Sequence, residues 1–257
     1  MARVLVTGSS TGLGLMAGQL LVEQGHEAVL HARNPARAEE TRRELPQATG
    51  IVVGDLSDLA GMRSVAEQAQ RLGPFDAVIH NAALGYQERG RNAPADGLPA
   101  LFAVNTLAPY VLTALLPRPR RLVFLSSGMH RGASAHLDDL TWTRRRWNAS
   151  AAYAESKLHD VLLAFGIARR WPEVRSNAVE PGWVATRMGG PSAPDDLDQA
   201  HRTQVWLAVS DDRGAQVTGK LFFHLRERAP NAEAHDIELQ EGLLEACQRL
   251  SGIALPR

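Results

Sequence analysis

The chain has 257 residues, of which 44% are hydrophobic and 22% charged, a composition typical of a globular protein that can bury a sizeable core. Its 28 basic residues equal its 28 acidic residues, which argues against a role that depends on bulk charge, such as nonspecific binding to nucleic acid or to an anionic membrane. A single cysteine, Cys247, excludes an internal disulfide and is consistent with a reducing compartment.

The first residues enter an apolar run directly, without the features of a signal peptide. No stretch approaches the roughly 18 consecutive apolar residues that are needed to span a bilayer. We therefore expect a cytoplasmic protein that does not associate with membranes.

Short apolar runs alternate along the chain with longer segments of helical period. We expect strands at 4–7, 28–32, 51–53, 75–80, 122–125, 176–179 and 221–223, and helices at 13–24, 35–45, 58–72, 98–116, 150–171 and 196–209. Nearly continuous apolar strands that alternate with helices indicate a parallel sheet covered on both faces. Because no repeat or low-complexity linker divides the chain, we predict one α/β domain over residues 1–257, a doubly wound Rossmann-type fold with a mostly parallel sheet of seven strands.

Ligands of such sheets bind beyond the carboxyl ends of the strands, where the winding direction reverses. The segments that directly follow the apolar runs should therefore converge on one crevice. They are 8–14, Arg33, Asp55, 81–83, 126–130 and 181–186.

The first of these segments is rich in glycine and reads Thr7-Gly8-Ser9-Ser10-Thr11-Gly12-Leu13-Gly14. It follows the first strand and opens a helix, which is the context that a dinucleotide-binding loop requires. Glycine allows close approach of the backbone, and the free N–H groups at the start of the helix attract a pyrophosphate. The alternative is a tight turn that binds no ligand.

The second strand ends in Ala32-Arg33-Asn34 and carries no carboxylate there. An acidic residue at this place binds the ribose 2′-hydroxyl of NAD, whereas an arginine accommodates the 2′-phosphate of NADP. Arg33 therefore favours NADP(H) over NAD(H). The alternative is an ordinary surface arginine in a region that is crowded with arginines.

Tyr153 and Lys157 lie in a predicted helix and share one of its faces at the i, i+4 spacing. A free phenol has a pKa of roughly 10 and is a poor base near neutrality, and a nearby ammonium favours the phenolate. The pair can therefore supply general acid–base catalysis, although a tyrosine and a lysine four residues apart more often form a solvated face.

The motifs taken together resemble the classical short-chain dehydrogenase/reductase family over essentially the full chain. The resemblance rests on their order and spacing: the glycine loop, Asp55, Asn81-Ala82-Ala83, Asn105, Ser126-Ser127, Tyr153 with Lys157, and Pro181-Gly182. It implies a nicotinamide-dependent enzyme that interconverts a carbonyl and an alcohol.

The resemblance also implies roles for individual residues. Asn105, Ser127, Tyr153 and Lys157 would form the catalytic tetrad, in which Ser127 holds the substrate oxygen and Asn105 joins a proton relay that ends at Lys157. Contacts to the cofactor would come from Gly8, Ser10, Thr11, Gly12, Leu13, Gly14, Arg33, Asp55, Leu56, Asn81, Ala82, Tyr153, Lys157, Pro181, Gly182, Val184 and Thr186. Ser126 competes for the role of the serine, and Asn105 has a structural hydrogen bond as its alternative.

Two departures from the family pattern stand out. Ala83 replaces the last glycine of the usual Asn-Asn-Ala-Gly motif, and 26 residues separate Ser127 from Tyr153, about double the commonest spacing in the family. This insertion, about 128–150, and the tail 217–250 resemble the retinol dehydrogenase-like and related reductase branch. The tail also suggests a surface or subunit-contact helix.

The substrate should meet loops at 84–97, 128–150 and 183–201. Four side chains could line an apolar pocket there or close the loops over the core: Trp142, Trp147, Trp183 and Met188. Arg144-Arg145-Arg146 could attract an anionic substrate, but three basic residues in a loop are usually a solvated stretch. His130 could contact the substrate, but a loop histidine is more often incidental. The histidines are scattered, so no metal site is expected.

The sequence thus predicts an NADP(H)-dependent oxidoreductase, a ketone or aldehyde reductase or an alcohol dehydrogenase, that acts on an apolar small-molecule carbonyl or alcohol substrate. Family resemblance makes a homo-oligomer plausible. Two alternatives stay open, a non-catalytic NADP(H)-binding regulator on the same fold and, ranked last, an NAD-dependent sugar epimerase or dehydratase.

Overall fold

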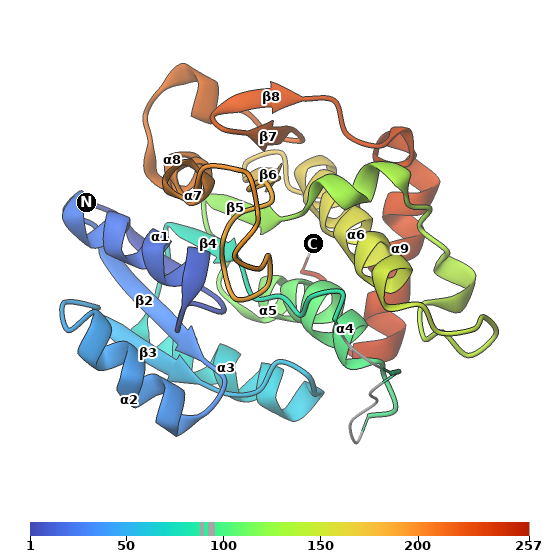
Figure 1. Ribbon diagram of the computed structural model, residues 1–257, viewed down its shortest axis with the longest axis horizontal. Helices are drawn as coiled ribbons and strands as arrows, with labels where there is room; N and C mark the ends of the chain where they lie inside the picture. The colour runs from blue at the N-terminus through green and yellow to red at the C-terminus, as the bar shows by residue number, and fades with distance from the viewer. Residues whose placement is uncertain (88–89, 92–95, 257) are drawn as a thin grey trace.

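The computed structural model describes residues 1–87, 90–91 and 96–256, and these residues form an eight-stranded sheet between two layers of helices (Figure 1). The strands are β1 (Arg3–Val6), β2 (Glu27–Ala32), β3 (Gly50–Val53), β4 (Ala77–His80), β5 (Arg121–Leu125), β6 (Arg175–Val179), β7 (Leu221–Phe223) and β8 (Arg226–Arg228). Their spatial order is β3-β2-β1-β4-β5-β6-β7-β8, and all neighbours pair in parallel except β7 and β8. The winding direction therefore reverses between β1 and β4.

Helices cover both faces of the sheet. They are α1 (Gly12–Glu23), α2 (Pro35–Glu44), α3 (Leu59–Leu72), α4 (Ala100–Phe102), α5 (Ala108–Leu115), α6 (Ala149–Arg170), α7 (Leu197–Ala200), α8 (Arg202–Val209) and α9 (Ile237–Ser251). Short helical turns are the π turn η1 (Ala103–Leu107) and the 3-10 turns η2 (Gly128–Gly132), η3 (Leu137–Asp139), η4 (Arg213–Ala215) and η5 (Ala232–His235).

The core has one part on each face of the sheet because successive strand residues point to opposite sides. In β1, Val4 and Val6 pack with α1 and α8, whereas Leu5 packs with the cluster that contains α3, α5 and α6. All three residues are fully buried, as expected for a parallel sheet covered on both sides. The doubly wound fold is confirmed.

The sheet has one strand more than the seven predicted. β8 consists of three exposed residues, Arg226 to Arg228, and pairs antiparallel with β7 through a turn in which His224 and Leu225 have φ of 48° and 63°. Neither side chain favours that left-handed backbone, and β8 has no apolar face, so the sequence contains no recognisable hairpin signal.

The predicted helix 98–116 is interrupted by the π turn η1. Pro109 lies just after this turn and has no N–H to offer the carbonyl of Asn105, four residues earlier. The helix is therefore locally wider at Asn105, and π turns of this kind are frequent at functional sites.

The C-terminal α9 packs along α6, where Glu241 forms ion pairs with Arg169 and Arg170. Its inner face is buried, with Leu243 and Cys247 fully inaccessible to solvent. Burial makes Cys247 a core residue and raises the pKa of its thiol. Among the described helices, none is both long enough and apolar enough to cross a membrane.

Candidate active site

The glycine loop packs so closely against the end of β4 that side chains are excluded. Gly8 has φ of 60°, and a Cβ atom placed on it would lie 2.5 Å from Ala82 Cα. A Cβ atom on Gly14 would lie 2.5 Å from Asn81 Nδ2. Asn81 in turn donates from Nδ2 to the carbonyls of Thr7 and Gly8, at 3.0 and 2.9 Å. Asn81 and Ala82 therefore brace the loop.

The start of α1 can receive an anion. Thr11, the residue before the helix, makes no side-chain hydrogen bond to the first turn, and that turn contains no acidic residue. Gly12 has φ of 58°, and a Cβ atom on it would meet only Thr186 Cγ2, at 4.0 Å. A side chain at Gly12 would fill this space. The uncapped N–H groups and the open glycine fit the pyrophosphate of a dinucleotide.

A buried histidine, His31 in β2, connects the glycine loop to the loop after β3. The N–H of Gly8 donates to His31 Nδ1 at 2.9 Å, and Nε2 therefore carries the hydrogen and donates to the carbonyl of Gly54, also at 2.9 Å. The backbone N–H of His31 donates to Ser9 Oγ at 2.8 Å. Burial lowers the pKa of His31, opposed by the Gly54 carbonyl and Asp55, so that the ring stays neutral and keeps its acceptor.

This arrangement leads to a prediction about cofactor affinity. We expect His31→Leu to weaken NADPH binding about 10-fold, because the Gly8 N–H and the Gly54 carbonyl both lose a buried partner. His31→Gln, whose amide offers one acceptor and one donor, should retain most of the affinity. Fluorescence titration measures both variants, and equal affinity of His31→Leu and the wild type would contradict this role.

Arg33 and Asp55 lie at the exposed ends of β2 and β3. Arg37 and Arg42 in the following helix are committed to ion pairs with Glu40 and Glu39. Within the described ranges, no carboxylate forms an ion pair with Arg33. Arg33 is therefore available to an incoming anion.

Asp55 Oδ1 accepts from the N–H of Ser57 at 2.9 Å and begins the turn into α3. Leu56 is buried at 3% exposure. On the opposite rim Gly182, with φ of 91°, packs against Asp195, and Val184 pairs with Asp195 in an isolated bridge. Thr186 faces Gly12 from this rim.

Tyr153 and Lys157 lie on successive turns of α6, which begins at Ala149 because Asn148 caps the N–H of Ala151. Lys157 Nζ lies 5.8 Å from the centroid of the Tyr153 ring. Tyr153 is 7% exposed, and among the described residues none donates to or accepts from its hydroxyl. The phenol is therefore held by packing while its hydroxyl is open to a ligand.

The two serines after β5 differ in their surroundings. Ser126 is buried and donates from Oγ to the carbonyl of Lys157 at 2.7 Å, so its hydroxyl ties β5 to α6. Ser127 is half-buried, and its Oγ accepts a long hydrogen bond of 3.4 Å from the N–H of Met129. Of the two, Ser127 has the hydroxyl that is available for a substrate.

His130 holds the segment after Ser127 in place. Its Nδ1 lies 2.6 Å from the carbonyl of Ser127, and its Nε2 lies 3.3 Å from the N–H of Asn231, which precedes η5. His130 is fully buried, and burial lowers its pKa. It therefore orients the backbone at Ser127 and has no exposed surface for a substrate.

Asn105 is fully buried, and its side chain bridges two elements. Oδ1 accepts from the N–H of Leu84 at 2.7 Å, and Nδ2 donates to the carbonyl of Leu84 and to Ser156 Oγ, each at 3.0 Å. The amide thus makes structural hydrogen bonds between the loop after β4 and α6. A place for Asn105 in a proton relay would have to involve its backbone.

An apolar wall surrounds Tyr153. Trp142 is 8% exposed and belongs to a cluster with Leu101 and Tyr153, against which Tyr86, Trp147 and Met188 pack. The Tyr86 and Tyr153 rings meet edge to face with centroids 5.8 Å apart. Trp183 differs from the other tryptophans because it is 53% exposed. Residues 88–89 and 92–95 of the predicted substrate loop 84–97 lie outside the described residues.

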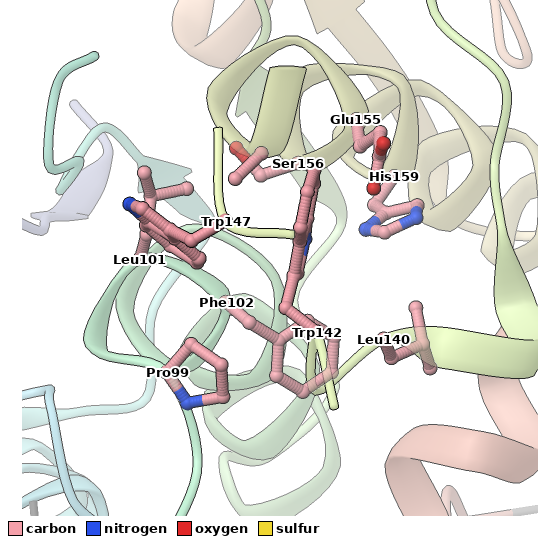
Figure 2. A pocket seen from close by; sticks show the side chains of 10 residues that line it. Pro99, Leu101, Phe102, Leu140, Trp142, Trp147, Glu155, Ser156 and His159 are labelled. Carbon is pink, nitrogen blue, oxygen red and sulfur yellow. The ribbon is translucent and has the colours of Figure 1, made fainter. Parts of the chain in front are cut away.

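A small cavity of about 10 Å³ lies behind this wall, between Trp142, Trp147 and the α6 residues Glu155, Ser156 and His159 (Figure 2). That volume holds about one water molecule. It is too small for an organic substrate.

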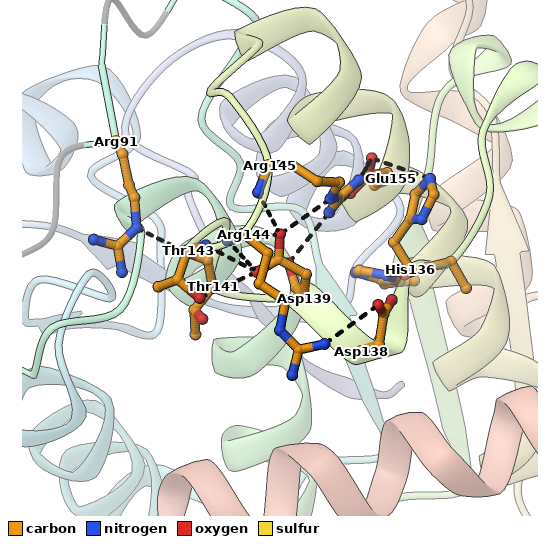
Figure 3. Close-up of polar contacts among 11 residues, drawn as sticks. Arg91, His136, Asp138, Asp139, Thr141, Thr143, Arg144, Arg145 and Glu155 are labelled. Carbon is orange, nitrogen blue, oxygen red and sulfur yellow. Dashed lines mark hydrogen bonds and ion pairs between the residues drawn. The ribbon is translucent and has the colours of Figure 1, made fainter.

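The insertion 128–150 is fixed to α6 by a buried ionic cluster (Figure 3). Arg145 binds both carboxylate oxygens of Glu155, at 2.7 and 3.1 Å, and Asp139 Oδ2 at 3.1 Å. Its guanidinium also lies over the Trp142 ring, 4.1 Å from the centroid. Burial raises the pKa of Asp139, but hydrogen bonds from Thr143, Arg144 and Arg145 outweigh it and lower the value to about 2.

The sequence interpretation of the three arginines was therefore wrong for one of them. Arg145 is a half-buried anchor with a side chain 28% exposed, whereas the side chain of Arg144 is 71% exposed and makes only a loose contact with Asp138. Three consecutive arginines give no indication of which one is anchored, because the anchoring of Arg145 depends on the carboxylate of Glu155, ten residues later.

The structure also reveals Asp160, which sequence reasoning missed. Asp160 Oδ2 lies 2.7 Å from Lys157 Nζ, and both side chains are almost completely buried. The i, i+3 spacing of a lysine and an aspartate was visible in the sequence, but such pairs are common on exposed helices.

The structure thus brings the predicted segments to the carboxyl edge of the sheet, around the reversal between β1 and β4. Arg33 and Asp55 lie at its far end. The fold and the glycine loop are typical of the dinucleotide-binding class of α/β proteins, and α6 adds a tyrosine–lysine pair.

Comparison with known proteins identifies the family. The family model described as short chain dehydrogenase matches residues 2–133. An uncharacterized oxidoreductase of Emericella nidulans is 41% identical over 260 residues, which cover 100% of this chain and 99% of the relative. Human retinol dehydrogenase 13 is 31% identical, with 98% of this chain and 85% of the relative covered.

Solved structures agree on the fold. A crystal structure of an uncharacterized protein from Mycobacterium paratuberculosis superposes with a TM-score of 0.85 at 25% identity, covering 100% of this chain and 96% of that one. A blue fluorescent protein from a metagenomic library, in complex with NADPH, gives a TM-score of 0.69 at 21% identity, with 86% and 95% coverage. The chain belongs to the short-chain dehydrogenase/reductase family, in its retinol dehydrogenase-like branch, and is an oxidoreductase.

Proposed function

We propose that the protein is an NADP(H)-dependent oxidoreductase that interconverts a carbonyl and an alcohol, with Tyr153 as the general acid and base. The observation that carries the proposal is the unpartnered hydroxyl of Tyr153 on a ring whose centroid lies 5.8 Å from Lys157 Nζ. Such a phenol can exchange a proton with a substrate oxygen.

The cofactor would lie across the carboxyl ends of the strands. In this proposal the pyrophosphate meets the N–H groups from Ser10 to Gly14, and the adenosine end meets Arg33 and Asp55 with Leu56. The nicotinamide end meets the rim from Pro181 to Thr186, while Asn81 and Ala82 support the loop between them. When bound, the nicotinamide supplies the hydride chemistry that no protein side chain can provide.

The side chains of the chain itself handle position and protons. Ser127 Oγ donates to the substrate oxygen, which places that oxygen beside the Tyr153 hydroxyl. In reduction Tyr153 gives its proton to the developing alkoxide, and in oxidation its phenolate removes the hydroxyl proton. The Lys157 ammonium would stabilise the negative charge that develops on the Tyr153 oxygen, and the Asn105 backbone carbonyl would hold a water molecule through which the proton is passed onward.

The preference for NADPH leads to a second prediction. Arg33→Ala should weaken NADPH binding about 10- to 100-fold and leave NADH binding within about 2-fold, because a charge-assisted bond to phosphate contributes about 1.5–3 kcal/mol. Arg43→Ala, which removes an exposed arginine from the neighbouring helix, is the matched control and should keep the preference. The account is wrong on this point if the wild type binds both cofactors equally by fluorescence titration.

The apolar wall supports an apolar substrate. Tyr86 and Met188 come from the loops after β4 and β6 and pack beside Tyr153, so a hydrophobic group next to the reacting carbonyl would lie against them. The exposed Trp183 and Met129, the latter 39% exposed, would extend that surface outward.

A screen tests the proposal as a whole. NADPH oxidation at 340 nm would be followed with aromatic and aliphatic ketones, aldehydes and quinones, and NADP⁺ reduction with the corresponding alcohols. We expect turnover with a subset of apolar compounds in at least one direction. No turnover across the panel, with NADPH still bound, would favour a cofactor-binding regulator instead.

A further inference from the structure

Asp160 is a buried carboxylate that lies one turn beyond Lys157 on α6. The two side chains are 2% and 3% exposed, and Lys157 Nζ lies 2.7 Å from Asp160 Oδ2. Lys157 Nζ also donates to the carbonyl of Leu125 at 2.7 Å. An ammonium has three N–H donors, so these two contacts leave one for a ligand in the crevice.

The Lys157 ammonium needs a counter-charge because of where it lies. Removing a charged amine from water is costly, and buried lysines without an anionic partner lose their proton far more readily than exposed ones. The nearest anion is Asp160, and the Leu125 carbonyl adds a dipole but no charge. Asp160 therefore supplies the negative charge that a buried ammonium requires.

The ion pair also affects the carboxylate of Asp160. Burial raises the pKa of Asp160 to about 7, opposed by the charge of Lys157 and by their hydrogen bond. The nearest residue in sequence with a titratable group, His159, is occupied by the Ala135 carbonyl and Thr106, and burial lowers its pKa to about 4. The elements packed against α6 carry these charged or titratable groups: Arg121 in β5, Arg175 in β6, His130 and Arg131 in η2, Glu233 and His235 in η5, and Glu238, Glu241, Glu245, Cys247 and Arg249 in α9.

We propose that Asp160 is a positioning residue for the reaction, which keeps Lys157 protonated and holds its Nζ between β5 and α6. The inference rests on the proposed role of Lys157 beside Tyr153. Asp160 itself contacts only the lysine. Asp160 would affect catalysis only through the positive charge of Lys157, which stabilises negative charge on the Tyr153 oxygen.

The chain offers a direct test because it contains only two lysines, Lys157 and Lys220. Protein labelled with ¹³C at Cε and ¹⁵N at Nζ of lysine should give two side-chain signals, and Lys220→Arg assigns them. Lys220 is 42% exposed and pairs with Glu227, so it serves as an internal reference. The two signals are followed from pH 6 to pH 11, with circular dichroism to define the range in which the protein is folded.

We expect Lys157 of the wild type to keep its ammonium signal to a pH at least two units higher than Lys157 of Asp160→Asn. Asparagine retains the shape and a hydrogen-bond acceptor, so the loss of charge is the main change. Asp160→Ser removes the same charge with less bulk and should give the same result, which keeps the test available if the first variant does not fold. The Lys220 midpoint should not move in either variant.

An unchanged Lys157 midpoint in folded Asp160→Asn or Asp160→Ser would overturn the proposal. The measurement needs no substrate, so it is separate from the proposed reaction: a shifted Lys157 with no turnover in any screen would leave the pairing intact and refute the activity. With an active substrate, the proposal further predicts that the alkaline limb of the kcat profile moves to lower pH in Asp160→Asn. If the ion pair were purely structural, its loss in Asp160→Asn would lower the stability of the protein without moving that limb.

Discussion

Tyr153→Phe is expected to lower kcat at least about 1000-fold, since the phenol is the group that exchanges a proton with the substrate oxygen and such catalysis contributes about 100- to 10,000-fold. Phenylalanine keeps the ring that packs in the wall with Trp142 and Tyr86. The affinity for NADPH should therefore stay within about 3-fold. Steady-state rates on a substrate from the screen and a fluorescence titration measure the two quantities.

Tyr110→Phe is the matched control for this variant. Tyr110 is also buried, but its hydroxyl donates to the carbonyl of Ile253 at 2.9 Å, in the C-terminal segment. Tyr110→Phe should lower the free energy of unfolding by about 1 kcal/mol and leave kcat unchanged. Equal rates for Tyr153→Phe and the wild type would refute the assignment of the general acid.

Arg145→Ala is expected to destabilise the fold by about 3–5 kcal/mol, because it leaves two buried carboxylates, Asp139 and Glu155, without their shared cation. The Trp142 ring would also lose the guanidinium that lies 4.1 Å from its centroid. Urea unfolding at pH 7 measures the change, with the slope of the transition compared between variants.

Arg144→Ala and Arg146→Ala are the controls, since both residues are exposed neighbours of Arg145. Each should change the free energy of unfolding by less than about 0.5 kcal/mol. If all three alanine variants were equally stable, the ionic cluster would not be what fixes the insertion to α6, and the wall beside Tyr153 would need another explanation.

The sheet and the crevice were predictable because both follow from local patterns. Apart from β6, which reads Arg-Ser-Asn-Ala-Val, the parallel strands are mostly apolar runs, and the segments after the strands meet at one edge through topology alone. The hairpin strand β8 was not predictable, since its three exposed residues make few packing demands and its turn uses His224 and Leu225 with positive φ.

The site was predictable where motifs determine it and not where partners come from distant parts of the chain. Nothing near Arg145 in the sequence distinguishes it from Arg144, because its burial depends on Glu155 across the insertion. The role of His31 was not predictable, because its ring binds Gly8 and Gly54, which are distant from it in the sequence. The choice between Ser126 and Ser127 likewise depends on the carbonyl of Lys157, which accepts from Ser126.

The most direct test of the central claim follows the hydride itself. Wild-type protein would be incubated with NADPH that carries two deuterium atoms at C4 of the nicotinamide, together with a carbonyl substrate from the screen. Mass spectrometry of the alcohol should show one deuterium at the carbinol carbon, and Tyr153→Phe should form this product at least about 1000-fold more slowly. Alcohol formed without deuterium, or formed equally fast by Tyr153→Phe, would contradict the account.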